Sequence, residues 1–418
     1  MRFLRTTQNP LTRNVASLVG ATAIAQAVQL GVTPFLTRIY GPEEFAVFQV
    51  YFSLAAILSV IATLRYELAV VASDDSQEAK KLVAGSLGIS LGVGLLVFTT
   101  LASFKIYGRI EVPSLYLWTL PLFVILSGTS QAFNNYSIRN STFQLNFWSR
   151  ILSSIAQAGV ALGMGLQGAL HTGLMTSVVA GQVVWALILG KGFPMRTEFP
   201  STRTRLDQVM VSLKRHSKFP KYNAPHALID VVQDHGIIFL LGFFFENTIM
   251  AFYGQAYRLL KAPVGFIGSA IHQVYYPDFT RRIQSGENLR PALLKMYLRL
   301  FIIGLPFFAT IAWFAEPLFT WLLGPQWTEV GRIARLLTPW LFLNFIVSPF
   351  DSIPLILSRQ GTAALIATFE FILRAIAIII GSVMESAMTG LALVGIFSAL
   401  ISCTEMVWYY RITGKNHK

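Results

Sequence analysis

Charged residues are scarce in this sequence. Only 13% of its 418 residues are Asp, Glu, Lys or Arg, whereas soluble globular domains average about 25%. Hydrophobic residues make up 54%, and apolar runs of about 20 residues, long enough to span a bilayer, recur along the chain. The scarcity of charge therefore argues against a soluble globular protein and predicts a polytopic membrane protein.

Cysteine and the common catalytic motifs are also lacking. A single cysteine, Cys403, excludes a disulfide framework or a cysteine metal site within one chain. There is no G-x-x-x-x-G-K-[ST] phosphate-binding motif and no H-E-x-x-H zinc motif, and we interpret GMGLQG at 163–168 as a chance match to G-x-G-x-x-G, because no strand precedes it. We therefore expect no cofactor, no metal site and no enzyme activity.

Acidic residues are outnumbered, with 20 Asp and Glu against 33 Lys and Arg and a net charge of +13. In a membrane protein this excess indicates topology rather than a nucleic-acid partner, because Lys and Arg collect in cytoplasmic loops. With the N-terminus inside, the expected outer loops hold only Arg38, Lys105, Arg109, Arg332 and Arg335. The asymmetry predicts that both termini are cytoplasmic.

We expect an all-α fold of about twelve transmembrane helices. The predicted spans are 15–36, 45–64, 83–104, 114–133, 151–167, 172–190, 224–245, 250–276, 296–315, 335–357, 361–383 and 387–410. The first is too long for the apolar region of a cleavable signal peptide.

A basic, proline-containing segment at 191–222 follows six of these spans and precedes six. We expect an N-terminal six-helix lobe at 1–190, a cytoplasmic linker at 191–222 and a C-terminal six-helix lobe at 223–418. Within the linker, LDQVMVSLKRH is typical of an amphipathic helix on the membrane surface. Two lobes with the same orientation predict a central cavity between them.

Two cations lie inside the eighth predicted span, in AYRLLKAP at 256–263. At 100° per residue, Arg258 and Lys261 share a narrow face with Gly254, Gly265 and Gly268. A charged side chain at the bilayer centre costs about 2.5–3.5 kcal/mol, so this face is expected to meet protein or a water-filled cavity.

The seventh span offers a partner for one of these cations. It carries His226, Asp230 and Asp234 on one stripe, and a short hairpin to the eighth span puts Asp234 level with Lys261. Lys261 is therefore either paired with Asp234 or functional, whereas Arg258 has no carboxylate at its level on this helix pair and is predicted to be functional. The stripe itself is either a proton- or sodium-coupling site or a set of structural counter-charges.

Other polar side chains have two interpretations each. Gln26 and Gln29 in the first span either line the cavity or bond a neighbouring helix. Arg38 either lies at the cavity mouth or snorkels to the interface. Arg65 either meets a lipid phosphate or anchors its helix, and on a helix it does not face Glu67, two residues on.

An internal ion pair is expected in the eleventh span. Glu370 and Arg374 are four residues apart, and side chains at this spacing are neighbours on a helix.

Three segments resemble the Wzx-type flippases of bacterial polysaccharide assembly: TPFLTRIYGPEEFAVFQ (33–49), RYELAVVASDDSQEAKKL (65–82) and AYRLLKAPVGFIGSAIHQVYYPDF (256–279). That family belongs to the superfamily of multidrug extruders and the lipid II flippase. The resemblance implies a twelve-helix fold of two six-helix lobes in the bacterial inner membrane, with both termini cytoplasmic. It also implies alternating-access translocation of a polyprenyl-pyrophosphate-linked oligosaccharide, such as the O-antigen repeat of lipopolysaccharide.

Relatives in this family place cations in a central cavity, and Arg258 matches that pattern. A guanidinium offers two parallel donors to phosphate oxygens, and an ammonium offers a point charge. The predicted substrate-binding residues are Arg258, Lys261, Arg38, Arg65, Gln26, Gln29 and Tyr257, with Asn134 and Gln157 as further candidates to meet the sugars. The expected partners are the lipid-linked oligosaccharide, membrane lipids and other polysaccharide-assembly proteins.

Two other functions stay open. A cation-coupled multidrug exporter would need an anionic, aromatic site for organic cations, which the cationic stripe disfavours. A membrane-embedded polysaccharide polymerase or scaffold is the third alternative. The sequence does not indicate the glycan, the coupling ion or the oligomeric state.

Overall fold

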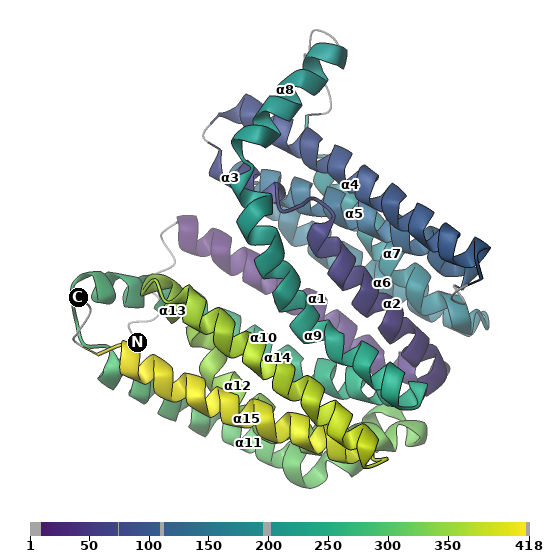
Figure 1. Ribbon diagram of the computed structural model, residues 1–418, viewed down its shortest axis with the longest axis vertical. Coiled ribbons are helices and arrows are strands. Elements are labelled where there is room, and N and C mark those ends of the chain that lie inside the picture. The colour runs from purple at the N-terminus through teal and green to yellow at the C-terminus, as the bar shows by residue number, and fades with distance from the viewer. Residues whose placement is uncertain (1–9, 74, 109–112, 195–201, 415–418) are drawn as a thin grey trace. The chain divides into compact units, whose positions relative to one another are not determined.

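The computed structural model describes residues 10–73, 75–108, 113–194 and 202–414, and within these ranges the regular structure is helical (Figure 1). The α-helices are α1 (Pro10–Ile39), α2 (Pro42–Ile61), α3 (Glu67–Ala72), α4 (Ser76–Ile106), α5 (Ser114–Arg139), α6 (Phe143–Leu166), α7 (Leu170–Gly190), α8 (Thr202–Arg215), α9 (Ala224–Phe244), α10 (Asn247–Gln284), α11 (Arg290–Leu323), α12 (Thr328–Val347), α13 (Ile353–Ile356), α14 (Gln360–Val383) and α15 (Ala387–Ile412).

The long helices confirm the predicted all-α membrane architecture. Each expected span overlaps one of them, and nine segments of the described chain are long and apolar enough to cross a membrane by length and composition. One expected span is not a single continuous helix. The span expected at 335–357 lies within a candidate span at Pro325–Ile356, but α12 ends at Val347 and a 3-10 turn follows at Ser348–Phe350. Pro349 supplies no backbone donor, so an α-helix is not readily continued through it.

The chain divides into two compact units by its contacts. Unit 1 comprises Met1–Tyr40 and Val47–Gly236, and unit 2 comprises Gly41–Ala46 and Ile237–Lys418. The division falls inside α9, so the described part of the basic linker groups with unit 1. The lobe boundaries expected at 190 and 223 stay a prediction.

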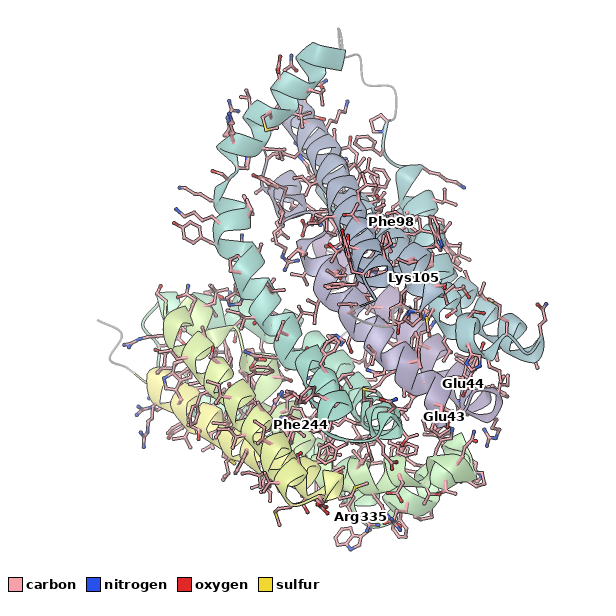
Figure 2. All side chains as sticks on the ribbon, turned by 45° about the vertical axis from the view of Figure 1, so that its right-hand side comes forward. Glu43, Glu44, Phe98, Lys105, Phe244 and Arg335 are labelled. Atoms are coloured by element: carbon pink, nitrogen blue, oxygen red, sulfur yellow. The ribbon has the colours of Figure 1, made fainter. Side chains whose placement is uncertain are left out.

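Unit 1 is held together by a few close helix approaches. In it α6 packs on α1 and α7, α5 packs on α4 and α7, and the short α3 packs on α4 and α5. The Tyr40 hydroxyl donates to Ala161 O at 2.7 Å, and Gly165 makes room for this ring, since a Cβ there would come within 2.8 Å of Tyr40. Toward its C-terminal end, α4 carries Phe98, which contacts Trp118 on α5, and Lys105, whose Nζ donates to Ser114 Oγ (Figure 2).

The start of α4 is capped by Asp75. Its carboxylate accepts from the backbone N–H of Gln77 at 3.0 Å and of Glu78 at 3.2 Å. These bonds, led by the one from Gln77, hold the pKa of the Asp75 carboxyl below its ordinary value. The cap fixes where α4 begins.

The amphipathic segment of the linker forms α8, which packs on α4. Leu213 is buried against Gly85, where a Cβ would lie 2.8 Å from Leu213 Cδ2. Ser212 Oγ donates to Glu78 Oε1 at 2.6 Å, and Arg215 Nη1 lies 3.7 Å from the same oxygen. The polar residues of α8 thus attach it to the capped start of α4.

Unit 2 is built around α12, which packs on α10, α11 and α15. Trp327 and Trp340, before and within α12, are almost fully buried. Gly395 on α15 allows close contact, since a Cβ there would collide with the backbone of Leu336. Near the start of α12, Arg335 Nη1 lies 3.1 Å from Glu316 Oε1 on α11 (Figure 2).

Candidate functional site

The two cations of AYRLLKAP lie on α10, in unit 2. Both Arg258 and Lys261 are partly buried. Lys261 Nζ donates to Asn344 Oδ1 on α12 at 3.1 Å and lies 5.8 Å from the centroid of the Tyr257 ring. The ammonium is therefore bound by protein groups, as expected for an intramembrane cation.

Aromatic rings extend from this cation toward a second one. Tyr257 stacks on Tyr253 and on Trp340, with ring centroids 5.8 and 5.7 Å apart. The other cation, Arg374 on α14, has its Cζ 4.2 Å from the centroid of the Trp340 ring. A cation over an aromatic face is stabilised by the ring quadrupole, so these rings support cationic side chains within unit 2.

Arg374 is a structural cation. It is 7% exposed, it forms the predicted ion pair with Glu370, and its Nε donates to Ser398 Oγ at 2.7 Å. The ion pair expected from the four-residue spacing is thereby confirmed.

Sequence reasoning missed Asn344 as the partner of Lys261 and Trp340 as the partner of Tyr257, and it gave Asp351 no role. Asp351 accepts from the Tyr409 hydroxyl at 3.3 Å and interacts electrostatically with Lys261. One signal was present, because Trp340 and Asn344 are four residues apart and so share a face of their apolar helix. Helix spacing does not indicate which other helix that face packs against, because tertiary packing determines it.

The stripe on α9 belongs largely to unit 1. His226 Nδ1 lies 3.1 Å from Asp230 Oδ2, with both side chains mostly exposed. Further along, His235 Nδ1 lies 3.4 Å from Ser53 Oγ on α2. Asp234 and Lys261 belong to different units, so both interpretations of Lys261, paired with Asp234 or functional, stay predictions.

The contact between Arg65 and Glu67 shows that the expectation that these two side chains do not face each other was wrong. The helix has ended at Ile61, and Leu64 and Arg65 take left-handed φ angles of 49° and 64° before α3 begins at Glu67. Two left-handed residues turn the chain sharply, and Arg65 Nη1 comes within 3.4 Å of Glu67 Oε1. Glu67 is buried and also accepts from the Thr63 hydroxyl.

The polar residues of α1 are distributed along the helix. Gln29 Nε2 donates to Ser154 O at 3.0 Å and lies 3.3 Å from Ser154 Oγ on α6, so it makes the interhelical bond that was one of its two interpretations. Gln26 is partly buried. Arg38 is exposed near the helix end, and its Nη1 donates to Pro34 O at 2.8 Å.

Comparison with known families supports the predicted resemblance. The model of a polysaccharide biosynthesis protein family matches residues 35–332. No curated protein sequence matches the chain.

Solved structures share the fold at low sequence identity. The lipid II flippase MurJ, in an inward closed conformation, matches with a TM-score of 0.72 and 13% identity, over 94% of this chain and 86% of that chain. A multidrug resistance MATE family transporter, inward-facing, matches with a TM-score of 0.66 and 15% identity, over 94% of each chain. A MOP superfamily transporter from Pyrococcus furiosus matches with a TM-score of 0.61 and 17% identity, over 96% of this chain and 95% of that chain.

Proposed function

We propose, from the premise that the chain belongs to the polysaccharide biosynthesis protein family, that it is a flippase for a lipid-linked oligosaccharide. The substrate is a polyprenyl-pyrophosphate-linked O-antigen or related repeat unit, and it moves across the bacterial inner membrane by alternating access. Membrane lipids and other polysaccharide-assembly proteins are its partners. The multi-pass helical fold, shared with MurJ and MATE proteins, supports a transport role.

The observation that carries this proposal is the pair of cations on α10. Taking phosphate charges through hydrocarbon without compensation is prohibitive, so a flippase for a lipid pyrophosphate needs cationic groups at membrane depth. Arg258 and Lys261 share one face of a predominantly apolar stretch of α10, and Lys261 is positioned by Asn344. Arg258 supplies the two-pronged donor for phosphate oxygens, and Lys261 adds a point charge.

The remaining candidates take supporting roles in this proposal. Arg38 brings positive charge to the end of α1, and Arg65 brings it to the segment between α2 and α3. Gln26, Gln29 and Tyr257 offer amides and an aromatic ring to sugars. His226, Asp230 and Asp234 are the candidates for coupling to protons or sodium.

The multidrug-exporter alternative requires a different charge. Organic cations are attracted by carboxylates and aromatic faces. The aromatic faces of Tyr257 and Trp340 already lie beside Lys261 and Arg374. A scaffold makes no use of a cation at membrane depth. A polymerase acting on a lipid pyrophosphate would use one too, and here the fold shared with MurJ and MATE proteins favours the flippase.

The test is the Arg258→Ala variant in cells that export the glycan. We expect export to fall at least about tenfold, since hydrogen bonds between charged groups are worth about 1.5–3 kcal/mol. Export by Arg258→Lys should lie between that of the wild type and that of Arg258→Ala. The protein level in the membrane should not change. Arg335→Ala removes an arginine from an ion pair at the start of α12 and should export normally.

Wild-type export by Arg258→Ala would contradict the proposal. Loss of the protein from the membrane would instead assign Arg258 a structural role and would also overturn it.

A further inference from the structure

A partly buried arginine that forms no ion pair with a described carboxylate lies in unit 1. Arg150 is on α6, and its Cζ lies 5.6 Å from the centroid of the Trp185 ring on α7. Among the described residues it makes no ion pair, and its Nε is buried without a hydrogen-bond partner. The proposed transport mechanism gives this side chain no role.

Other polar side chains on the same two helices are also unsatisfied. Asn146, one turn earlier on α6, is 0% exposed, and neither its Nδ2 nor its Oδ1 has a partner in the described chain. The same holds for Gln182 Oε1 and for Trp185 Nε1, which lie three residues apart on α7. Each buried polar atom without a partner costs about 1–3 kcal/mol, and native proteins rarely accumulate them.

The two helices fix this group of side chains from both sides. Toward the α6–α7 turn, a Cβ at Gly181 would lie 3.2 Å from Ser153 O. Toward the other end, a Cβ at Gly192 would lie 2.6 Å from Leu145 Cδ2. Arg150 and Trp185 lie between these close approaches, so their relative position is set by backbone packing.

The chemistry of the group selects an anion. Its unsatisfied donors are Arg150 Nε, Asn146 Nδ2 and Trp185 Nε1, against the acceptors Asn146 Oδ1 and Gln182 Oε1. It carries one positive charge and no negative one. Water would satisfy the neutral atoms, and an oxyanion would in addition compensate the guanidinium through charge-assisted hydrogen bonds.

The depth of the group indicates where such an anion comes from. Arg150 lies seven residues beyond Phe143, where α6 begins, which is about 10 Å along the helix. By the distribution of Lys and Arg, this end of α6 is cytoplasmic. We propose that Arg150, with Asn146 and Trp185, binds the phosphate group of a lipid in the cytoplasmic leaflet. The inference requires the predicted topology but not the proposed transport activity.

The test measures lipid binding to the purified full chain in detergent, without any transport assay. A ligand that binds the folded state raises the melting temperature in a concentration-dependent way. The probes are short-chain phosphatidic acid, a neutral diacylglycerol of the same chain length, and inorganic phosphate. We expect phosphatidic acid to stabilise the wild type at concentrations where the other two do not.

Variants then assign the binding to this group. Arg150→Gln should lower the affinity for phosphatidic acid at least about tenfold. Arg150→Lys should retain part of that affinity, and Trp185→Phe should lower it only by the contribution of one hydrogen-bond donor. Arg335→Gln, which removes an arginine at the start of α12, should bind as the wild type does. If Arg150→Gln does not fold, Asn146→Leu, which removes a buried amide, serves as the second variant and should also weaken binding.

The proposal is overturned if Arg150→Gln, or Asn146→Leu in its place, binds phosphatidic acid like the wild type. It is likewise overturned if the wild type shows no response to phosphatidic acid, in which case water satisfies the group. Equal responses to phosphatidic acid and inorganic phosphate would reject a lipid as the source of the anion.

Discussion

Lys261 shows how a cation is accommodated inside an apolar helix. Its ammonium has an amide acceptor on a neighbouring helix, an aromatic ring beside it and a carboxylate in electrostatic reach. Such groups replace the water that the charge loses in the membrane. The environment of the Lys261 ammonium therefore depends on α12, and the sequence of α10 alone does not predict it.

The Lys261–Asn344 bond predicts an energetic coupling between the two positions. Asn344→Leu should lower the free energy of unfolding by about 1–3 kcal/mol, because it leaves the ammonium without its acceptor. Lys261→Met should also destabilise, since the amide oxygen then loses its donor. The double variant should recover much of the loss, and unfolding of all four proteins in detergent measures this. Strictly additive losses would show that the bond contributes nothing.

Local spacing predicted one charged contact and failed for another. Glu370 and Arg374 pair because they lie on an uninterrupted helix, where the four-residue rule holds. Arg65 and Glu67 also pair, because the helix ends before them and two non-glycine residues adopt left-handed backbone angles. Hydropathy does not report such a break, so the expected geometry was that of a continuous helix.

At the scale of elements, apolar length located the spans well. The helices expected at 224–245 and 361–383 are found at Ala224–Phe244 and Gln360–Val383. The span expected at 335–357 falls within a candidate span at Pro325–Ile356, but it is not one continuous helix, because the apolar character continues past Val347 while Pro349 interrupts the helix. An average over apolar residues does not register the missing backbone donor.

Leu213 supplies the buried apolar contact between α8 and α4, beside the polar contacts of Ser212 and Arg215. We predict that Leu213→Asp detaches α8, because a carboxylate cannot be buried against Gly85 without a partner. Limited trypsin digestion of the full chain should then cut faster at Lys214 and Arg215. Leu206→Asp is the matched control, since Leu206 is on the same helix but 65% exposed. Equal digestion of the two variants would contradict the attachment.

At the scale of the whole molecule, the family and the fold identify different things. The family model indicates a role in polysaccharide assembly, and the shared fold includes both a lipid flippase and multidrug transporters. For this chain, the positive charge on α10 is the feature that distinguishes a lipid flippase from a multidrug transporter. The choice of a lipid pyrophosphate over an organic cation rests on Arg258 and Lys261.

The most direct measurement is transbilayer movement in liposomes that contain the purified wild-type protein and a polyprenyl-pyrophosphate-linked oligosaccharide. A membrane-impermeant enzyme that trims the glycan reports which leaflet it occupies. We predict that the accessible fraction rises beyond the outer-leaflet share toward all of the substrate, while empty liposomes show the outer-leaflet share alone. If the glycan stays in its leaflet while the same liposomes transport an organic cation, the protein is a drug exporter and the flippase proposal is wrong.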